Sequence, residues 1–412
     1  MTIAQQTPRL SSAELDAADP LAALREAFYT PDAGQLTSYL DGNSLGRPLK
    51  VTAENLPKFV EEAWGSRLIR GWDEQWMDEP TRVGDRIGEV TLGAAAGQVT
   101  VGDSTSVMLY KLIRAAVDAR PGRDEIVIDR DNFPTDRFII EGIAAERGAT
   151  IKWIASNPAS GVREADLDGL LGERTAVVVL SHVAYRSGFL ADAKAITAKV
   201  HQAGALMLWD LCHSVGSVPL ELDAWDVDLA VGCTYKYLNG GPGSPAFAYV
   251  NKGRQAELQQ PIWGWMGADN PFGMTAAYAP ARGIRRFITG TPPVLAMQPI
   301  KDMVELIASV GMDAVRAKSI KLTEYAITLA EEFLVPNGVE IVSPRNTAER
   351  GSHITVDHPL FADVTARLWE RGVIPDFRPP HGLRIGLSPL STSYAEVELG
   401  VTAIRDVLLE LK

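Results

Sequence analysis

The chain has 412 residues, of which 46% are hydrophobic and 22% are charged, proportions typical of a soluble globular protein with about two or three domains. Its formal net charge of −12 disfavours nucleic acid or an anionic membrane as the main partner. No stretch approaches the roughly 20 apolar residues of a membrane span, and residues 1–12 lack the apolar core of a signal peptide, so we expect a cytoplasmic protein.

Helical segments are predicted to dominate the N-terminal part of the chain. Residues 11–30 have serine caps and apolar residues at near-helical spacing, with Pro20 as an interruption. Residues 39–49 contain a glycine-rich turn, which is either a surface turn or a place where backbone approaches a ligand. Residues 52–92 look helical again and carry several tryptophans, among them Trp64, which suit aromatic packing or the wall of a pocket for a planar substrate.

Between residues 98 and 203, short apolar strands alternate with amphipathic helices. This alternation predicts an α/β fold with a largely parallel sheet that is covered on both faces. The first of these helices begins near Thr105 and Ser106, a turn that either caps the helix or binds an anion. Phe133 and Asp136 follow the next strand, where they offer a planar cofactor a ring and a carboxylate or serve as a core ring and a helix cap.

The stretch from 205 to 249 carries the strongest chemical signal in the sequence. One apolar run ends in Asp210, with His213 three residues later, and a second leads into Lys236 and a glycine-rich turn. Open α/β sheets bind ligands at the carboxyl ends of their strands. We therefore expect one edge of the sheet to gather the loops that carry Thr105, Phe133, Ser181, Asp210 and Lys236.

A carboxylate and a lysine at such an edge suit pyridoxal 5'-phosphate (PLP). This cofactor needs an amine for a Schiff base and an anion that keeps its ring nitrogen protonated. The alternative is that Asp210 only caps a helix and that Lys236 is solvated. The two cysteines, Cys212 and Cys233, lie in apolar runs without metal-ligand spacing, so we expect buried core thiols and no metal.

After residue 250 the pattern changes. An irregular glycine- and tryptophan-rich stretch and a proline-rich turn lead into a long helix predicted at 299–334. Residues 340–412 then read as strand, helix, strand, helix. Arg384 lies on a strand among apolar residues and needs an anion, either a substrate carboxylate or a structural salt bridge. We predict a large domain at 51–300, a smaller α/β domain at 301–412, and an N-terminal arm at 1–50 that joins the smaller domain.

Four motifs together resemble the kynureninase family. They are GNSLG at 42–46, FPTD at 133–136, the D-x-x-H of Asp210 and His213, and TYKYLN at 234–239. The resemblance extends from about residue 39 to 390. It implies a fold-type I PLP enzyme, similar to class V aminotransferases, and a homodimer with shared active sites. The implied activity is hydrolysis of L-kynurenine to anthranilate and L-alanine, in tryptophan catabolism and the pyridine nucleotide (NAD) biosynthesis fed by it.

The resemblance also implies residue roles. Lys236 would form the Schiff base, Asp210 would pair with the ring nitrogen, and Tyr235 would hold the phosphate and donate a proton. Arg384 would bind the α-carboxylate, with Ser44 and Trp64 beside the substrate. The implied cofactor-binding residues are Thr105, Ser106, Phe133, Asp136, Ser181, Asp210, His213, Tyr235, Lys236, Trp265 and Thr291, with Trp265 and Thr291 supplied by the neighbouring subunit.

Other functions differ from this one in the residues that they require. A cysteine desulfurase needs a mobile nucleophilic cysteine in its second domain, but no cysteine follows Cys233. An aminotransferase or a non-catalytic protein that only holds the cofactor would share the aspartate–lysine pair. A dinucleotide-binding protein would need a G-x-G-x-x-G turn between a first strand and helix, and this sequence has no such turn. Vertebrate-type kynureninases have His and Asn where this chain has Trp64 and Thr291, which predicts a preference for L-kynurenine over 3-hydroxy-L-kynurenine.

Overall fold

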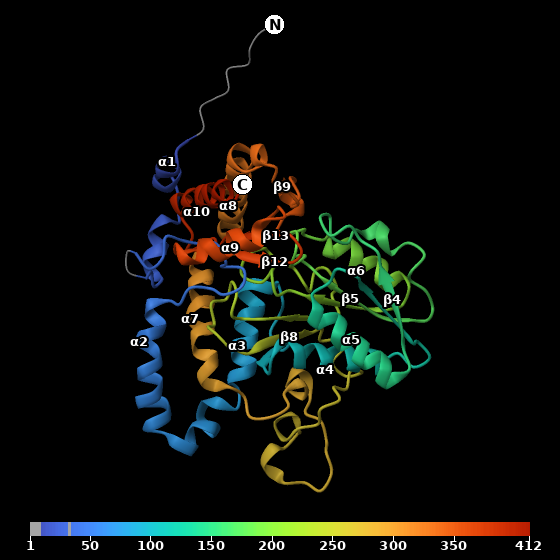
Figure 1. The fold of residues 1–412 in the computed structure, drawn as a ribbon. Helices are drawn as coiled ribbons and strands as arrows, with labels where there is room; N and C mark the ends of the chain where they lie inside the picture. The colour runs from blue at the N-terminus through green and yellow to red at the C-terminus, as the bar shows by residue number, and fades with distance from the viewer. Residues whose placement is uncertain (1–9, 32–33) are drawn as a thin grey trace.

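A computed structural model describes residues 10–31 and 34–412, so most of residues 1–12, which lack the apolar core of a signal peptide, lies outside the described residues. Two parts lie side by side: a larger one around a central sheet and a smaller one that carries the C-terminal helices (Figure 1). The α-helices are α1 (Ser12–Ala17), α2 (Lys50–Lys58), α3 (Glu79–Ile87), α4 (Thr105–Asp118), α5 (Pro134–Arg147), α6 (Ala193–Gln202), α7 (Val294–Val310), α8 (Met312–Phe333), α9 (Phe361–Glu370) and α10 (Tyr394–Glu410). The strands are β1 (Ser38–Tyr39), β2 (Val99–Gly102), β3 (Glu125–Asp129), β4 (Thr150–Ile154), β5 (Thr175–Ser181), β6 (Leu206–Asp210), β7 (Leu229–Gly232), β8 (Ala246–Val250), β9 (Glu340–Ile341), β10 (His353–Asp357), β11 (Val373–Ile374), β12 (Asp376–Arg378) and β13 (Gly382–Gly386).

The larger part contains a seven-stranded sheet in the order β2-β8-β7-β6-β5-β3-β4. Only β8 runs antiparallel to its neighbours, and the other pairs are parallel. Alternate residues of β5 enter different cores: Val177 packs with α4 and α5, whereas Val178 packs with α3, α6 and α7. The predicted α/β fold, with a mostly parallel sheet buried on both faces, is confirmed.

The smaller part is an antiparallel sheet, β12-β13-β10-β9, that packs with α8, α9 and α10 around its own core. The N-terminal segment belongs to it by contact, because α1 packs on α10 and β1 pairs with β11. The arm at 1–50 and the domains at 51–300 and 301–412 stay predictions.

Two predicted helices are divided in the structure. The helix expected at 299–334 is split into α7 and α8 at Gly311, whose φ of 84° is a conformation that favours glycine. The segment 11–30 forms α1 and a separate 3₁₀ helix, with Pro20 between them. In the part of the chain that the structure describes, no helix combines the length and the hydrophobicity needed to cross a bilayer.

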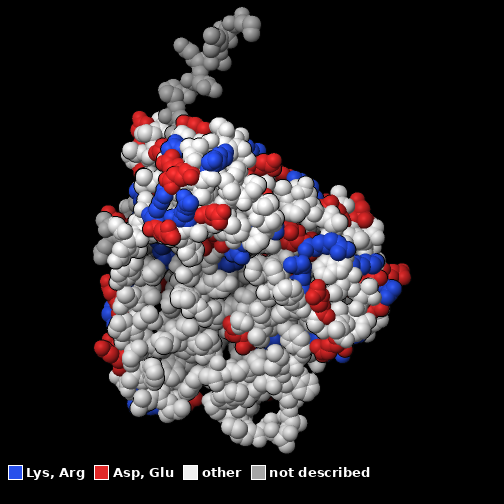
Figure 2. Space-filling view, in the orientation of Figure 1, with Lys and Arg blue, Asp and Glu red and all other residues white. Residues whose placement is uncertain are grey.

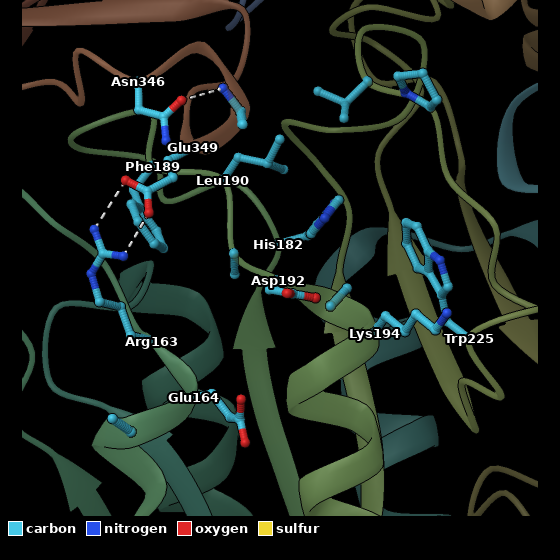
Figure 3. Close-up of a pocket in the computed structure, with 16 residues that line it drawn as sticks. Arg163, Glu164, His182, Phe189, Leu190, Asp192, Lys194, Trp225, Asn346 and Glu349 are labelled. Carbon is cyan, nitrogen blue, oxygen red and sulfur yellow. Dashed lines mark hydrogen bonds and ion pairs between the residues drawn. The ribbon is translucent and has the colours of Figure 1, made fainter.

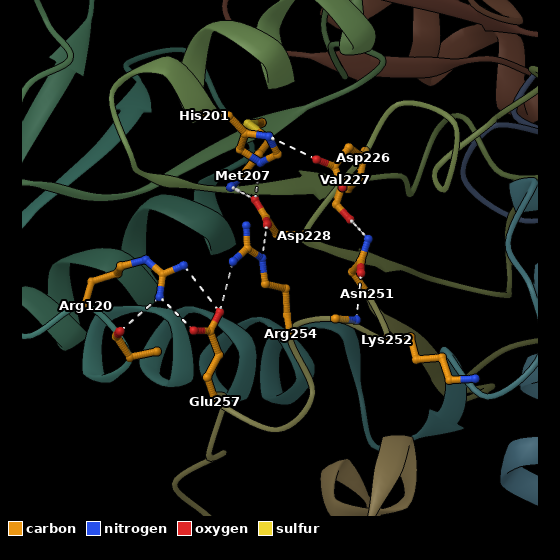
Figure 4. A network of polar contacts seen from close by, with 12 residues as sticks. Arg120, His201, Met207, Asp226, Val227, Asp228, Asn251, Lys252, Arg254 and Glu257 are labelled. Atoms are coloured by element: carbon orange, nitrogen blue, oxygen red, sulfur yellow. Dashed lines mark hydrogen bonds and ion pairs between the residues drawn. The ribbon is translucent and has the colours of Figure 1, made fainter.

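The amino ends of β6 and β7 are fixed by Asp228, a residue that is 1% exposed (Figure 4). Its carboxylate accepts hydrogen bonds from Met207 N at 2.8 Å and from Arg254 Nε at 2.7 Å, and it lies 2.7 Å from His201 Nε2. A buried carboxylate with this many partners is well satisfied. The network therefore holds both strands at the sheet edge opposite to the one that gathers the predicted site residues.

Candidate active site

Three neighbouring parallel strands bring Ser181, Asp210 and the turn before Lys236 to one edge. In register, Ser181 of β5 pairs with Asp210 of β6, and Asp210 pairs with Val231 of β7. The Asp210 side chain is held at the strand end, because its Oδ1 accepts a hydrogen bond from the backbone N–H of Cys212 at 2.7 Å. The carboxylate is thereby aimed before any ligand binds.

Lys236 lies against His213 inside this edge. Its Nζ is 3.2 Å from Nε2 and 3.4 Å from Nδ1 of the imidazole, and both side chains are buried. Burial, together with the positive charges of Lys236 and Arg384, lowers the pKa of His213 well below its usual value. His213 is therefore a neutral ring beside the amine.

Asp136 and Phe133 reach the same space from the start of α5. Asp136 is 1% exposed, and its Oδ2 has no hydrogen-bond partner among the described residues. Burial raises the pKa of this carboxyl well above its usual value, and the nearby Asp210 and Asp129 raise it further. A buried acid with one unpartnered oxygen destabilises the folded state unless a ligand supplies the missing hydrogen-bond partner.

Asn132, which sequence reasoning missed, ties these elements together. Its Oδ1 accepts hydrogen bonds from Ser181 Oγ at 2.9 Å and from the backbone N–H of Phe133 at 2.7 Å. The Phe133 ring meets the ring of Tyr185, also missed, edge to face at 5.4 Å. The only sequence signal for Asn132 was its position between a strand end and the FPTD motif.

The N-terminus of α4 follows β2 at the same sheet edge. Ser104 caps this helix by accepting a hydrogen bond from Val107 N at 3.4 Å, and Thr105 and Ser106 form the first turn. The free N–H groups of a helix of this length, with two hydroxyls, suit a phosphate. Tyr235 precedes the lysine, and burial raises the pKa of its phenol, as do the neighbouring thiols of Cys233 and Cys212.

Arg384 of the smaller part enters the site and is already engaged. It is 1% exposed, and its Nε donates to Asp376 Oδ2 at 2.6 Å. Its Nη1 donates to the carbonyl of Tyr185 at 2.8 Å, and its Nη2 donates to Ser44 Oγ at 2.9 Å. The structural salt bridge considered as an alternative above is thus present. The end of the guanidinium formed by Nη1 and Nη2 lies beside two uncharged groups, the Ser44 hydroxyl and the His213 ring.

Three predicted site residues lie apart from this group. Trp64 is 51% exposed and Trp265 is 43% exposed, and Thr291 is also exposed. Within the described residues, no hydrogen bond or ring contact joins any of them to Lys236 or Arg384. A single chain therefore gathers most, but not all, of the predicted set.

Both cysteines are free buried thiols beside Asp210 and Lys236, as expected. The backbone N–H of Cys233 lies 3.3 Å from Cys212 Sγ, so the two residues are neighbours on adjacent chain segments. Among the residues that the structure describes, no group of three or more His, Cys, Asp or Glu side chains could hold a metal ion.

The chemistry of this donor set fits PLP. Lys236 offers an amine, Asp210 an anion for a ring nitrogen, Phe133 an aromatic face and Asp136 an acid that lacks one partner. The first turn of α4 offers donors for a phosphate. These are the groups that an amine-reactive, planar, phosphorylated cofactor requires.

A separate cavity of about 820 Å³ lies between the two parts on the other side of β5 (Figure 3). His182, the residue after Ser181, lines it together with Phe189 and Trp225, and burial lowers the pKa of His182 to about 4. An ion pair between Arg163 and Glu349, at 2.7 Å, joins the two parts across its rim.

The sequence is similar to kynureninases over most of its length. Residues 315–404 match the family model "Kynureninase C-terminal domain". The chain is 43% identical over 401 residues to a kynureninase of Burkholderia pseudomallei, covering 96% of this chain and 94% of that protein. It is 40% identical over 410 residues to a kynureninase of Pseudomonas fluorescens, covering 98% of this chain and 96% of that one.

Solved structures share the fold at low sequence identity. A mutant of the cystine C–S lyase C-DES, with glycine covalently linked to its PLP cofactor, superposes with a TM-score of 0.79 at 18% identity, covering 92% of this chain and 100% of that one. A cysteine desulfurase of Thermococcus onnurineus superposes with a TM-score of 0.77 at 16% identity, covering 98% of this chain and 100% of that one.

Proposed function

The chain belongs to the kynureninase family, PLP-dependent hydrolases of tryptophan catabolism that convert kynurenine to anthranilate and alanine, and from this premise we propose which residues carry out the reaction. We propose that Lys236, Asp210 and Tyr235 act in catalysis and that Arg384 binds the α-carboxylate of L-kynurenine. The observation that carries the proposal is the buried contact between Lys236 and His213 at the edge where Asp210 and Asp136 also lie.

Different residues would bind PLP and the substrate L-kynurenine. Thr105 and Ser106 would hold the phosphate of PLP, Phe133 would stack on its ring, and Asp136 would find the partner that its Oδ2 lacks. The Arg384 edge beside Ser44 would receive the substrate carboxylate. The substrate's α-carbon would then lie close to Lys236, because His213 touches both Lys236 Nζ and Arg384 Nη1.

The proton transfers follow from the same contacts. Bound PLP supplies an electron-withdrawing ring that stabilises negative charge on the substrate's α-carbon. Asp210 holds a proton at the ring nitrogen, and Lys236 Nζ takes the α-proton. His213 stays neutral and positions that amine. Tyr235 keeps its Oη proton at working pH because its pKa is raised, so it can donate this proton as charge develops on the substrate.

We further propose a homodimer in which Trp265 and Thr291 complete the site of the partner. The face over α2, α7 and the segment after β8 carries few charged side chains (Figure 2). Exposed apolar residues gather there, with Val60 at 42%, Leu295 at 44% and Trp263 at 64% exposure. An apolar cavity of about 980 Å³, lined by Leu56, Val60 and Leu295 among others, opens on this face. Such a face is typical of a subunit interface.

We also propose that the protein is located in the cytoplasm. The two thiols are free although they are neighbours, which suits a reducing compartment.

The test is turnover by the PLP-loaded protein. Addition of L-kynurenine should release anthranilate, followed by its fluorescence, and an equal amount of L-alanine. Turnover that requires a keto-acid acceptor and releases no anthranilate would identify an aminotransferase instead. The ratio of kcat/KM for L-kynurenine and 3-hydroxy-L-kynurenine should favour L-kynurenine, because Trp64 and Thr291 offer little polar capacity for the extra hydroxyl. An equal or reversed ratio would contradict that preference.

A further inference from the structure

Asp376 controls which part of the Arg384 guanidinium faces the site. The two residues are directly opposite each other on the antiparallel strands β12 and β13, so their side chains lie on the same face of the sheet. Asp376 Oδ2 accepts from Arg384 Nε at 2.6 Å and also contacts Nη2. One carboxylate oxygen therefore occupies the edge of the guanidinium formed by Nε and Nη2.

The remaining N–H groups of Arg384 point elsewhere. Nη1 donates to the carbonyl of Tyr185, and Nη2 donates to Ser44 Oγ. The end of the guanidinium, formed by Nη1 and Nη2, thus lies between Ser44 and His213 Nε2, which is 3.5 Å from Nη1. Guanidinium groups bind carboxylates in pairs of parallel hydrogen bonds along one edge. While Asp376 is in place, a carboxylate can bind along this end only by replacing the uncharged Ser44 hydroxyl and His213 ring as partners of Nη2 and Nη1.

Asp376 is shared by two guanidinium groups. Arg378, two residues after Asp376 and on the same face of β12, donates from its Nε to the same Oδ2 at 2.7 Å. Asp41 is a second acid near this group, and burial raises the pKa of its carboxyl to about 6, so its charge is lost as the pH falls through that value. One hydrogen-bonded carboxylate therefore serves both Arg384 and Arg378.

We propose that Asp376 is a positioning residue that holds the Nε–Nη2 edge of Arg384 and thereby fixes its Nη1–Nη2 end as the seat of the substrate's α-carboxylate. This inference rests on the proposed binding role of Arg384. It assigns a task to a salt bridge that would otherwise be structural only. It also explains how a buried arginine that is already paired can still bind substrate.

The consequence of losing Asp376 is a change of geometry more than a loss of charge. Without its anchor, Arg384 keeps its positive charge and can offer the Nε–Nη2 edge to the substrate, so that the α-carbon is misplaced relative to Lys236. Misplacement by about 1 Å can lower a rate by about 10²-fold. We therefore expect Asp376→Asn to lower kcat for L-kynurenine by about 10²-fold, with a far smaller change in KM.

Two further variants separate positioning from general stability. Asp376→Glu keeps the anion and should recover part of kcat. Asp357→Asn changes an acid on the neighbouring strand β10 that has no described ion pair to Arg384, and it should leave kcat and KM near wild type. If Asp376 only stabilised the fold, Asp376→Asn would lower the melting temperature but leave kcat per cofactor-loaded site unchanged. That result, or a rise in KM at unchanged kcat, would overturn the proposal.

A crystal structure of the wild-type holoenzyme with L-alanine provides a test that does not depend on folding of a variant. The alanine carboxylate should bind the Nη1 and Nη2 atoms of Arg384 while Asp376 still holds Nε. A carboxylate bound away from Arg384, or one that displaces Asp376, would overturn the inference. Failure of the proposed function is a different result, because the wild-type holoenzyme would then release no anthranilate from L-kynurenine.

Discussion

Lys236 Nζ lies 3.2 Å from His213 Nε2 in a buried space, and among the residues that the structure describes no carboxylate hydrogen-bonds to this amine. The ring beside the amine is neutral, because the pKa of His213 is well below its usual value. The contact therefore holds the amine at the sheet edge that also carries Asp210 without adding a second charge beside it.

Replacement of this lysine should abolish both attachment of the cofactor and turnover. Lys236→Ala removes the amine, so the visible absorbance band of the PLP-loaded protein should be lost and kcat should fall by at least about 10³-fold. Lys252→Ala, at an exposed lysine just after β8, is the matched control and should retain the band and the activity. A band that survives in Lys236→Ala would place the attachment elsewhere.

Replacement of Asp136 should stabilise the unloaded protein and weaken its affinity for PLP. Asp136→Asn removes the charge of a fully buried acid, so at pH 8 we expect the free energy of unfolding of the unloaded protein to rise by about 1–3 kcal/mol. The folded-state pKa of Asp136 is raised, so its charged form opposes folding, and the gain should be larger at pH 8 than at pH 5. The affinity for PLP should fall in the same variant.

Urea unfolding at both pH values and titration with PLP measure these two effects. The exposed Asp73→Asn provides the control and should change neither quantity appreciably. A variant that is less stable without PLP, or one that binds PLP as tightly as the wild type, would show that Asp136 is satisfied by the protein alone.

Shared active sites should reveal themselves by complementation between inactive variants. Lys236→Ala and Trp265→Ala homodimers should each be nearly inactive. Subunit exchange between them would create hybrids in which one of two sites has both residues, and random mixing should restore about a quarter of the wild-type activity. If the mixture stays as inactive as its components, Trp265 does not serve the site of the partner.

The network of Figure 4 should make stability depend on pH through His201. The hydrogen bond to Asp228 raises the pKa of His201 above its ordinary value of 6.5. A raised histidine pKa stabilises the fold fully below the unfolded pKa, and this contribution is lost as pH rises through the folded pKa. His201→Gln should therefore cost more stability at pH 6 than at pH 9, as measured by urea unfolding at each pH.

A comparison of the stability loss at the two pH values tests whether the charge of His201 stabilises the fold. An equal loss of stability at pH 6 and at pH 9 would mean that the imidazole acts only through its shape and its neutral hydrogen bond. His381→Gln, at an exposed histidine, should leave stability unchanged at both pH values.

The sequence was sufficient to predict the sheet edge, because apolar strand patterns end directly at Ser181, Asp210 and the turn before Lys236. Their neighbours in space follow from parallel pairing, which is a regular rule. The break between α7 and α8 was missed because helical periodicity continues on both sides of Gly311, and the pattern of apolar residues does not record φ.

The partners of Arg384 could not be predicted from local patterns. Ser44 is 340 residues away in sequence, and Asp376 belongs to a strand of only three residues with little periodicity. Asn132 likewise gains its importance from contacts with Ser181, which lies on another strand. Such contacts depend on how the two parts of the molecule pack, and that packing is set by many residues at once.

The carboxyl end of β5 connects the cavity of Figure 3 with Asp210. Ser181 pairs with Asp210 at the sheet edge that gathers the predicted site residues, whereas the next residue, His182, lines the cavity of Figure 3. The backbone N–H of His182 donates to the carbonyl of Asp210 at 2.9 Å. A substitution in that cavity that moves His182 must also move the backbone that supports Asp210. The packing of Phe189 and Trp225 around the cavity is therefore linked, through the backbone of His182, to the position of the strand end that carries Asp210.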